Sequence, residues 1–123
     1  MIYIIEDDKY VRRGFELLLT SSGYEFNTFK SGDEFLGSYN YCKNDVIILD
    51  LGLEGMQGCE IIMKINELDK KVPVIVVTAS PDVTHRELCL KLGVLAFVRK
   101  PVDSDILLGH IHSALELNLN YNI

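Results

Sequence analysis

The sequence lacks several features that mark broad classes of protein. It has 123 residues, only three cysteines, and 12 basic residues against 18 acidic ones, which gives a formal net charge of −6. A domain that holds nucleic acid needs a basic face for the phosphates, so this charge argues against nucleic-acid binding by the chain itself. The charge leaves room for a divalent cation or a basic protein surface as a partner.

The three cysteines are too few and too scattered for a disulfide scaffold or a metal site. Cys42, Cys59 and Cys89 include no C-x-x-C pair, and an odd number without metal-ligand spacing is typical of free thiols in a reducing compartment. The three histidines lack ligand spacing too. The sequence shows neither a Cys/His nor a Ser/His/Asp arrangement for nucleophilic catalysis.

The chain also has no long apolar run and no recognisable targeting segment. No stretch approaches the roughly 20 apolar residues that a membrane-spanning helix requires. Residues 1–6 have no basic region and become acidic at once, unlike a secretory signal peptide. We therefore predict a cytoplasmic protein that makes no membrane contact.

Among the features that are present, four short apolar runs are rich in β-branched or aromatic residues and too short for helices. Continuous apolar runs, rather than alternating ones, indicate strands that are buried on both faces of a parallel sheet. A fifth segment alternates more and is predicted to form an edge strand. The four runs are residues 2–5, 46–49, 74–77 and 95–98, and the alternating segment is residues 24–29.

Apolar residues at helical spacing fill the gaps between these strands. Gly23 and Gly93 are predicted to end two of the helices, and Ser31, with Glu34 three residues later, is predicted to start another. For the tail at residues 118–123, a frayed helix end and the start of a linker both fit. The predicted helices are residues 9–22, 31–39, 61–68, 82–92 and 103–115.

The predicted order is therefore a strand followed by a helix, five times over. Alternating strands and helices imply a parallel sheet with helices on both faces. Because crossovers are right-handed, few topologies remain, and we predict a doubly wound α/β fold with the flavodoxin-like strand order 2-1-3-4-5. The length suits one domain over residues 1–123, and there is no internal repeat.

Polar side chains follow four of the predicted strands at the same end. In the predicted order these four strands are neighbours, about 4.8 Å apart, and functional groups in such sheets gather at the carboxyl ends of the strands. We therefore expect these side chains to converge. In chain order they are Glu6 and Asp7 after the first strand, Asp50 after the third, Thr78 after the fourth and Lys100 after the fifth.

This set of side chains suits phosphoryl transfer. Clustered carboxylates repel each other and raise each other's pKa, and a divalent cation relieves that repulsion; an all-oxygen site fits Mg²⁺. The Asp50 carboxylate can attack phosphorus to give an aspartyl phosphate. The cation, the Lys100 ammonium and the Thr78 hydroxyl would then each bind one phosphoryl oxygen.

Each of these residues also has a purely structural interpretation. Acidic residues after a strand are often turn residues or helix N-caps, and Asp8 is a candidate for that role. Threonine is common in strands, and a single lysine is usually on the surface. The functional interpretation therefore depends on four such positions lying at the same end of their strands.

The chain resembles the response-regulator receiver family of two-component signalling over nearly its whole length. Residues 12–13, 31–36 and 82–83 are similar to the branch of that family that often precedes a LuxR-type DNA-binding output. The segments that carry the resemblance are IIEDD at residues 4–8, VIILDL at 46–51, GMQG at 55–58, PVIVVTA at 73–79 and FVRKP at 97–101.

The resemblance implies a role for each matching residue. Asp50 would be the phosphoacceptor. Mg²⁺ would be held by Glu6, Asp7, Asp50 and the backbone carbonyl of Gly52.

On the other side of the site, the resemblance implies that Thr78 and Lys100 bind the phosphoryl group. Phe97 stands where the family keeps an aromatic residue whose rotamer follows the threonine. The Lys100–Pro101 bond is expected to be cis, as in the family; X-Pro bonds adopt that form at low cost.

The same resemblance implies a signalling switch and not an enzyme with its own substrate. A histidine kinase or a histidine phosphotransfer protein would donate the phosphoryl group. The surface made by the fourth helix, the fifth strand and the fifth helix would then change, and we expect homodimerisation or output contact there.

Some positions depart from the usual family pattern. Glu6 stands where aspartate is commonest, and Glu54 replaces the usual proline in the loop after the acceptor. Gly52 has no side chain to touch the phosphoryl group, and Ser80 is small and neutral. These last two positions tune hydrolysis in the family.

Three other functions were considered for these residues, and one of them stays open. A Mg²⁺ phosphohydrolase with Asp50 as nucleophile would need a second acidic residue two positions later, where Gly52 stands. A receiver-like interaction module that is never phosphorylated stays open because of Glu6 and Glu54. A flavodoxin is disfavoured because the loop after the first strand is acidic and lacks a Ser/Thr/Gly phosphate cradle.

Overall fold

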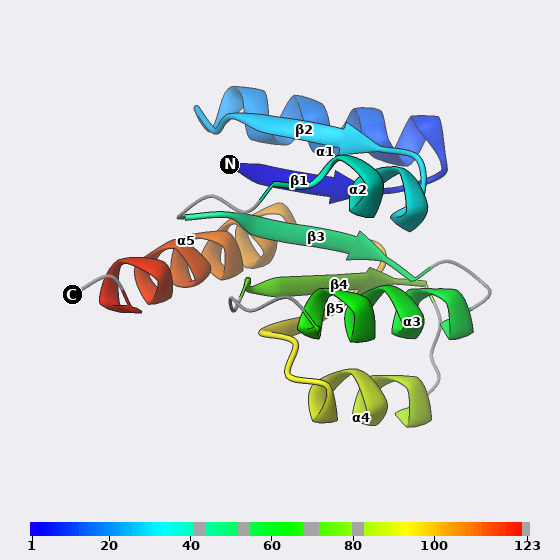
Figure 1. The fold of residues 1–123 in the computed structure, drawn as a ribbon. Helices are drawn as coiled ribbons and strands as arrows, with labels where there is room; N and C mark the ends of the chain where they lie inside the picture. The colour runs from blue at the N-terminus through cyan, green and yellow to red at the C-terminus, as the bar shows by residue number, and fades with distance from the viewer. Residues whose placement is uncertain (41–43, 52–54, 68–71, 80–82, 122–123) are drawn as a thin grey trace.

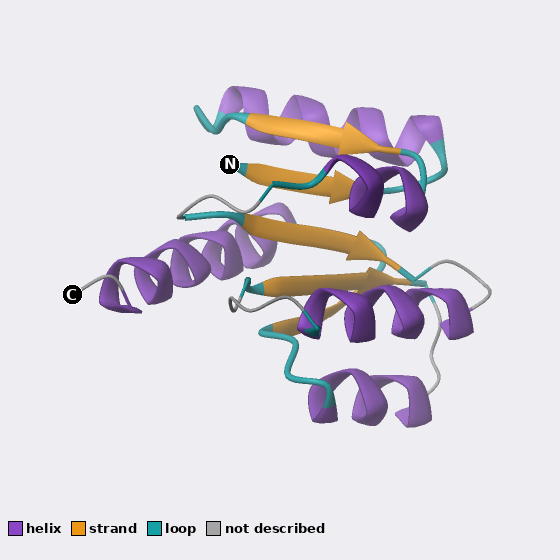
Figure 2. Ribbon diagram, viewed as in Figure 1, coloured by secondary structure: helices purple, strands orange, loops and turns teal. Residues whose placement is uncertain are grey.

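The computed structural model describes residues 1–40, 44–51, 55–67, 72–79 and 83–121. Its centre is a five-stranded sheet in which all strands are parallel, so that the arrowheads in Figure 2 point to the same end. The order β2-β1-β3-β4-β5 confirms the predicted doubly wound α/β fold. The strands are β1 (Ile2–Ile5), β2 (Phe26–Phe29), β3 (Val46–Asp50), β4 (Val74–Thr78) and β5 (Ala96–Arg99).

The helices cover both faces of this sheet (Figure 1). α1 and α5 pack on one face, and α2, α3 and α4 pack on the other. Within the described residues, none of them has both the length and the apolar character that crossing a membrane demands. The helices are α1 (Lys9–Ser21), α2 (Gly32–Ser38), α3 (Gly55–Asn66), α4 (Val83–Lys91) and α5 (Ser104–Tyr121).

The central strand β3 buries side chains on both faces of the sheet. Val46 and Ile48 pack in the cluster with α1 and α5, whereas Ile47 and Leu49 pack in the cluster with the other three helices. None of the four is more than 1% exposed. This double burial explains why the strand is a continuous apolar run in the sequence.

The residues predicted to begin or end helices lie at the helix ends in the structure. Ser31 Oγ accepts a hydrogen bond from the backbone N–H of Glu34 at 3.1 Å, as an N-cap does. Asp8 caps α1 in the same way, with bonds of 2.8 and 3.2 Å from two N–H groups of the first turn. Gly23 and Gly93 follow α1 and α4 with φ values of 81° and 88°, a region that strains residues with a Cβ.

The edge strand is shorter than predicted. β2 begins at Phe26, whereas the sequence pattern placed its start at Tyr24. The backbone N–H of Tyr24 donates to the carbonyl of Leu19 at 3.0 Å, so Tyr24 belongs to the turn that ends α1. That turn, and not the apolar alternation, sets where the strand starts.

Two helices are longer than predicted. α3 begins at Gly55, well before the predicted start at Ile61, because two glycines near its beginning disfavour a helix in isolation and hide it from the sequence pattern. α5 continues through Tyr121, so residues 118–121 belong to the last helix, in agreement with the helical alternative for the tail.

Two of the cysteines are buried free thiols between the helices of one face. Cys59 on α3 and Cys89 on α4 belong to the same apolar cluster. Burial, together with the neighbouring Cys59 thiol, raises the pKa of Cys89 to about 12. The third predicted free thiol, Cys42, lies outside the described residues.

Candidate functional site

The carboxyl ends of four neighbouring strands meet at one edge of the sheet. β3 ends in Asp50 and β4 ends in Thr78, while Glu6 and Lys100 directly follow β1 and β5. In the strand register Asp50 pairs with Val77, which sets Thr78 next to the end of β3. The structure thus gathers the predicted site residues at a single edge.

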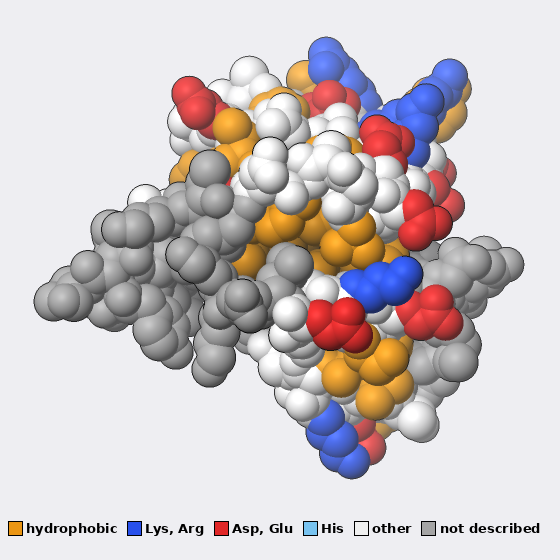
Figure 3. Space-filling model, viewed as in Figure 1, with side chains coloured by type: hydrophobic (Ala, Val, Ile, Leu, Met, Phe, Trp, Pro, Cys, Tyr) orange, Lys and Arg blue, Asp and Glu red, His pale blue; other side chains and the backbone are white. Residues whose placement is uncertain are grey.

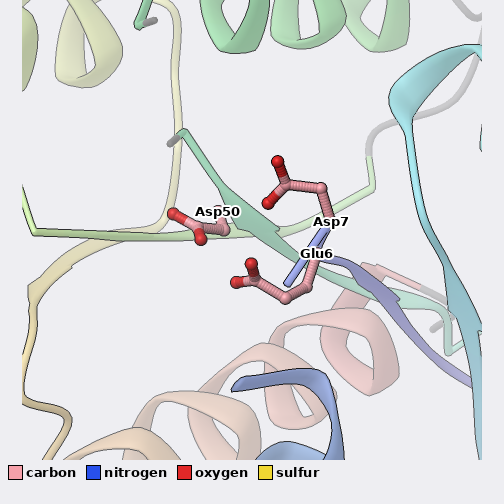
Figure 4. Close-up of side chains that lie close together, drawn as sticks. All are labelled: Glu6, Asp7 and Asp50. Carbon is pink, nitrogen blue, oxygen red and sulfur yellow. The ribbon is translucent and has the colours of Figure 1, made fainter. Parts of the chain in front are cut away.

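Three carboxylates lie together there. One carboxylate oxygen from each of Glu6, Asp7 and Asp50 lies within 4.8 Å of the others (Figure 4). Glu6 is buried and Asp7 is exposed, so the cluster is open to solvent on the Asp7 side. An all-oxygen group of this kind is able to bind a metal ion.

The Lys100 ammonium compensates part of this negative charge. Lys100 Nζ donates a hydrogen bond to Asp50 Oδ2 at 2.7 Å and lies 3.6 Å from Glu6 Oε2. Burial acts to lower the pKa of Lys100, but the hydrogen bond with Asp50 and the charges of Asp50 and Glu6 outweigh it and raise the pKa. Lys100 is therefore held as a cation between two carboxyl groups.

The backbone on both sides fixes the position of Lys100. Its N–H donates to the carbonyl of Thr78 at 2.7 Å, which ties the end of β5 to the end of β4. The Lys100–Pro101 peptide bond is cis, which confirms the sequence expectation.

Glu6 is the most perturbed carboxyl group of the cluster. Burial, followed by the contact with Asp50, raises the pKa of Glu6 to about 8. Its Oε1 accepts a hydrogen bond from the N–H of Asp8 at 3.1 Å, but Oε2 has no hydrogen-bond partner among the described residues. Burying this oxygen is costly; the Lys100 ammonium 3.6 Å away offsets part of that cost, and a metal ion bound beside Oε2 would offset more.

Thr78 and Phe97 occupy the same face of two adjacent strands. Thr78 is fully buried, and Phe97 is half-buried against the apolar cluster of α2, α3 and α4. In the register of β4 and β5, Val76 pairs with Phe97 and Thr78 pairs with Arg99, so Phe97 lies diagonally across from Thr78. The predicted pair of switch residues therefore lies close to the site, with the aromatic ring partly accessible.

The remaining predicted contributors lie outside the described residues. These are Gly52, whose backbone carbonyl was the fourth predicted metal ligand, together with Glu54 and Ser80.

One contact at the site was missed from the sequence. Arg12 Nη1 donates a hydrogen bond to the main-chain carbonyl of Glu6 at 2.9 Å. In the sequence, residues 12–13 stand out only as a feature of one branch of the family. The available signal was a basic residue in the first turns of the helix that directly follows the acidic segment.

The family model of the response regulator receiver domain matches residues 2–112. The chain belongs to this family. This membership confirms the resemblance drawn from the motifs: the chain is related to the receiver domains of two-component systems, which are signalling domains.

Two known transcriptional regulatory proteins match along most of this chain. The transcriptional regulatory protein GlrR of Escherichia coli K12 is 35% identical over 115 residues, which cover 94% of this chain and 26% of GlrR. The transcriptional regulatory protein FixJ of Rhizobium meliloti is 28% identical over 115 residues, with 94% of this chain and 56% of FixJ covered. This receiver chain thus spans about a quarter of one relative and about half of the other.

A solved receiver structure has the same fold. The crystal structure of a response regulator receiver domain protein from Clostridium thermocellum superposes with a TM-score of 0.85 at 26% identity, covering 98% of this chain and 97% of that one. Both the family and the fold predicted from the sequence are therefore confirmed.

Proposed function

We propose that residues 1–123 form a phosphoacceptor receiver domain in which Asp50 takes the phosphoryl group. The observation that carries this proposal is the position of Asp50 at the carboxyl end of β3, within the carboxylate cluster and 2.7 Å from the Lys100 ammonium. A nucleophilic carboxylate beside a fixed cation is what phosphoryl transfer requires, because the reaction depends on positioning and on neutralising charge.

The transfer itself is a substitution at phosphorus. One carboxylate oxygen of Asp50 forms a bond to phosphorus while the bond from phosphorus to an imidazole nitrogen of the donor breaks. The nitrogen keeps the electron pair and takes a proton from solvent. The donor in this proposal is a histidine kinase or a histidine phosphotransfer protein, and acetyl phosphate can replace it in vitro.

The carboxylate cluster fits Mg²⁺ as the metal of this site. Glu6, Asp7 and Asp50 would hold the ion, because all three offer hard oxygen ligands and Glu6 has a buried oxygen without a hydrogen-bond partner among the described residues. When bound, Mg²⁺ supplies positive charge that stabilises the phosphoryl oxygens. The backbone carbonyl of Gly52 is proposed as a further ligand.

Lys100 and Thr78 would bind the phosphoryl group after transfer. The Lys100 ammonium already contacts Asp50, so it needs little movement to pair with an added phosphoryl oxygen. The Thr78 hydroxyl, at the end of the adjacent strand, would bind another oxygen, and the Phe97 ring would follow the movement of Thr78.

The proposed output surface is formed by α4, β5 and α5. Figure 3 shows hydrophobic side chains exposed in the lower part of the view, over α3 and α4. On the proposed surface, Val83 and Leu90 of α4 and Ile106 of α5 are exposed apolar residues. We propose that this surface mediates homodimerisation or output contact in the cytoplasm, and that the domain is a switch whose only chemistry is its own phosphorylation and dephosphorylation.

The test is the intact mass of the protein after incubation with acetyl phosphate and Mg²⁺. The expected result is a gain of about 80 Da for one phosphoryl group in the wild type and none in Asp50→Asn. Asp33→Asn changes an exposed aspartate on α2 and should gain the same mass as the wild type.

Other outcomes would contradict the proposal in distinct ways. If the wild type neither gains mass nor binds Mg²⁺, the chain acts as an interaction module that is not phosphorylated. If it gains no mass but releases phosphate steadily, the phosphoryl group is hydrolysed rapidly and does not persist on the protein, which contradicts a lasting phosphorylated state and favours the phosphohydrolase interpretation.

A further inference from the structure

Arg12 reaches from α1 back to the loop that carries two of the three carboxylates. Its Nη1 donates to the main-chain carbonyl of Glu6 at 2.9 Å, and the Arg12 side chain is half-buried. Arg12 is held in place because its own N–H donates to the carbonyl of the N-cap residue Asp8 at 2.9 Å. The guanidinium therefore projects from the first turns of α1, a helix whose N-terminus is capped by Asp8.

The Glu6 carbonyl needs this partner because the sheet ends beside it. In a parallel sheet, the N–H and the carbonyl of one residue point toward the same neighbouring strand. The N–H of Glu6 donates to the carbonyl of Phe29 on β2 at 3.0 Å, and β2 ends at Phe29. The Glu6 carbonyl thus lies beyond the last residue of β2, and Arg12 takes the place of a strand partner.

Fixing this carbonyl also fixes the acidic side chains. The carbonyl of Glu6 and the N–H of Asp7 belong to one planar peptide unit, so its orientation sets the direction in which both side chains leave the backbone. Glu6 and Asp7 supply two of the three carboxylates of the cluster. The bond from the Asp8 N–H to Glu6 Oε1 and the bond from the Glu6 N–H to the Phe29 carbonyl also hold this segment.

We propose that Arg12 is a positioning residue that preorganises Glu6 and Asp7 for a divalent cation. This inference rests on the proposed function of the cluster as a Mg²⁺ site. Groups that orient metal ligands through hydrogen bonds typically contribute a factor of about 10 to 100 in metal affinity.

The sign of the effect separates positioning from simple electrostatics. A guanidinium repels a cation, so removal of its charge alone would tighten Mg²⁺ binding. Loss of positioning would weaken Mg²⁺ binding instead. Arg13, the next residue on α1, carries the same charge and is exposed, so Arg13→Ala reproduces the charge change without the contact to Glu6.

The experiment measures the Mg²⁺ dissociation constant of the whole chain by isothermal titration calorimetry. We expect Arg12→Ala to weaken binding roughly 10-fold, Arg13→Ala to leave it unchanged or slightly tighter, and Arg12→Lys to recover part of the loss. Thermal unfolding without Mg²⁺ shows whether each variant is folded, and Arg12→Lys replaces Arg12→Ala in the comparison if the alanine variant is not.

Each result bears on the inference separately from the proposed function. If the wild type binds Mg²⁺ and the Arg12 variants bind as tightly or more tightly, Arg12 does not position the ligands, whereas the proposed metal site stands. A wild type that shows no Mg²⁺ binding overturns both the metal site and the role of Arg12.

Discussion

The Lys100 ammonium donates a 2.7 Å hydrogen bond to Asp50 Oδ2 across 50 residues of sequence. This bond joins the end of β5 to the end of β3, with β4 between them. The same ammonium lies 3.6 Å from Glu6 Oε2, so a single cation contacts two carboxyl groups that a metal ion would also bind. We therefore expect the Lys100 ammonium to compete with a bound metal ion for the carboxylates and to be available to a phosphoryl group.

Replacing Lys100 should affect metal binding and phosphorylation in opposite directions. Lys100→Met removes the competing cation, so Mg²⁺ should bind at least as tightly as in the wild type. It also removes a charge that stabilises the transferring group, so the rate of phosphorylation by acetyl phosphate should fall by roughly 10- to 100-fold. Calorimetry and time-resolved intact mass measure the two quantities.

Lys91→Met is the matched control for this variant, because Lys91 is exposed on α4. It should match the wild type in both measurements. Weaker Mg²⁺ binding in Lys100→Met would show that the ammonium supports the metal site and does not compete with it.

Glu6 should make the metal-free protein less stable as the pH rises. Its pKa is about 8 in the folded protein against an ordinary 4.5, so folding favours the protonated form. Below pH 4.5 both states are protonated and there is no cost; the cost grows between pH 4.5 and about 8 and is constant above that range. Glu6→Gln resembles the protonated form and should raise the free energy of unfolding by about 1 to 3 kcal/mol at pH 8, with little gain at pH 5.

Urea denaturation without Mg²⁺ at the two pH values measures this difference. Glu60→Gln, at an exposed site on α3, should give equal stability changes at both. An equal gain at pH 5 and pH 8 for Glu6→Gln would mean that burial does not favour the protonated carboxyl.

Gly32 should tolerate no side chain, because α2 and α3 are in close contact there. A Cβ on Gly32 would lie closer to Cδ1 and Cγ1 of Ile61 than van der Waals contact allows. Gly32→Ala should therefore lower the free energy of unfolding by about 1 to 3 kcal/mol, as overpacking does. Chemical denaturation measures the loss.

Gly37 lies on the same helix with open space around it, so Gly37→Ala is the control. It should leave stability unchanged or raise it slightly, since alanine favours helix. If both alanine variants behave alike, helix propensity rather than contact with Ile61 decides the outcome at Gly32.

The buried Asp45 should depend on the hydroxyl of Tyr39. Tyr39 Oη donates to Asp45 Oδ2 at 2.9 Å, and the Asp45 side chain has no exposed surface. Tyr39→Phe removes a hydrogen bond to a buried carboxylate and should cost about 1 to 3 kcal/mol of stability. Tyr10 is 78% exposed, so Tyr10→Phe should cost almost nothing in the same denaturation assay.

Two results would oppose this prediction. Equal stability of the two phenylalanine variants would mean that Asp45 does not need the hydroxyl. A gain in stability for Tyr39→Phe would mean that the free-energy cost of burying the Tyr39 hydroxyl exceeds the stabilisation from its hydrogen bond to Asp45.

Much of the fold could be predicted because local and global signals agree. The apolar run at residues 46–49 is buried on both faces, as its unbroken hydrophobicity indicates, and Ser31 and Gly23 act at helix ends as their chemistry predicts. The predicted helix and strand boundaries were wrong where tertiary contacts outweighed the local propensity of the residues. Gly55 begins a helix despite its poor helix propensity, and Tyr24 is held by Leu19 in a turn.

The sequence by itself determined the strand order, and with it the edge of the sheet at which Glu6, Asp50, Thr78 and Lys100 meet. Alternating strands and helices make the strands parallel, so their carboxyl ends lie at one edge of the sheet; right-handed crossovers leave few strand orders, and the flavodoxin-like order 2-1-3-4-5 among them predicts which residues gather. Family motifs then indicated the chemistry of that edge.

Only the tertiary structure decided how these side chains affect each other. The raised pKa of Glu6 follows mainly from its burial and then from the nearby Asp50, and no local pattern contains either quantity. The bond from Arg12 to the Glu6 carbonyl arises because β2 ends at Phe29 and leaves that carbonyl without a strand partner. Desolvation and through-space contacts depend on the packed arrangement of the whole chain, whereas strand order depends on a pattern that the sequence carries residue by residue.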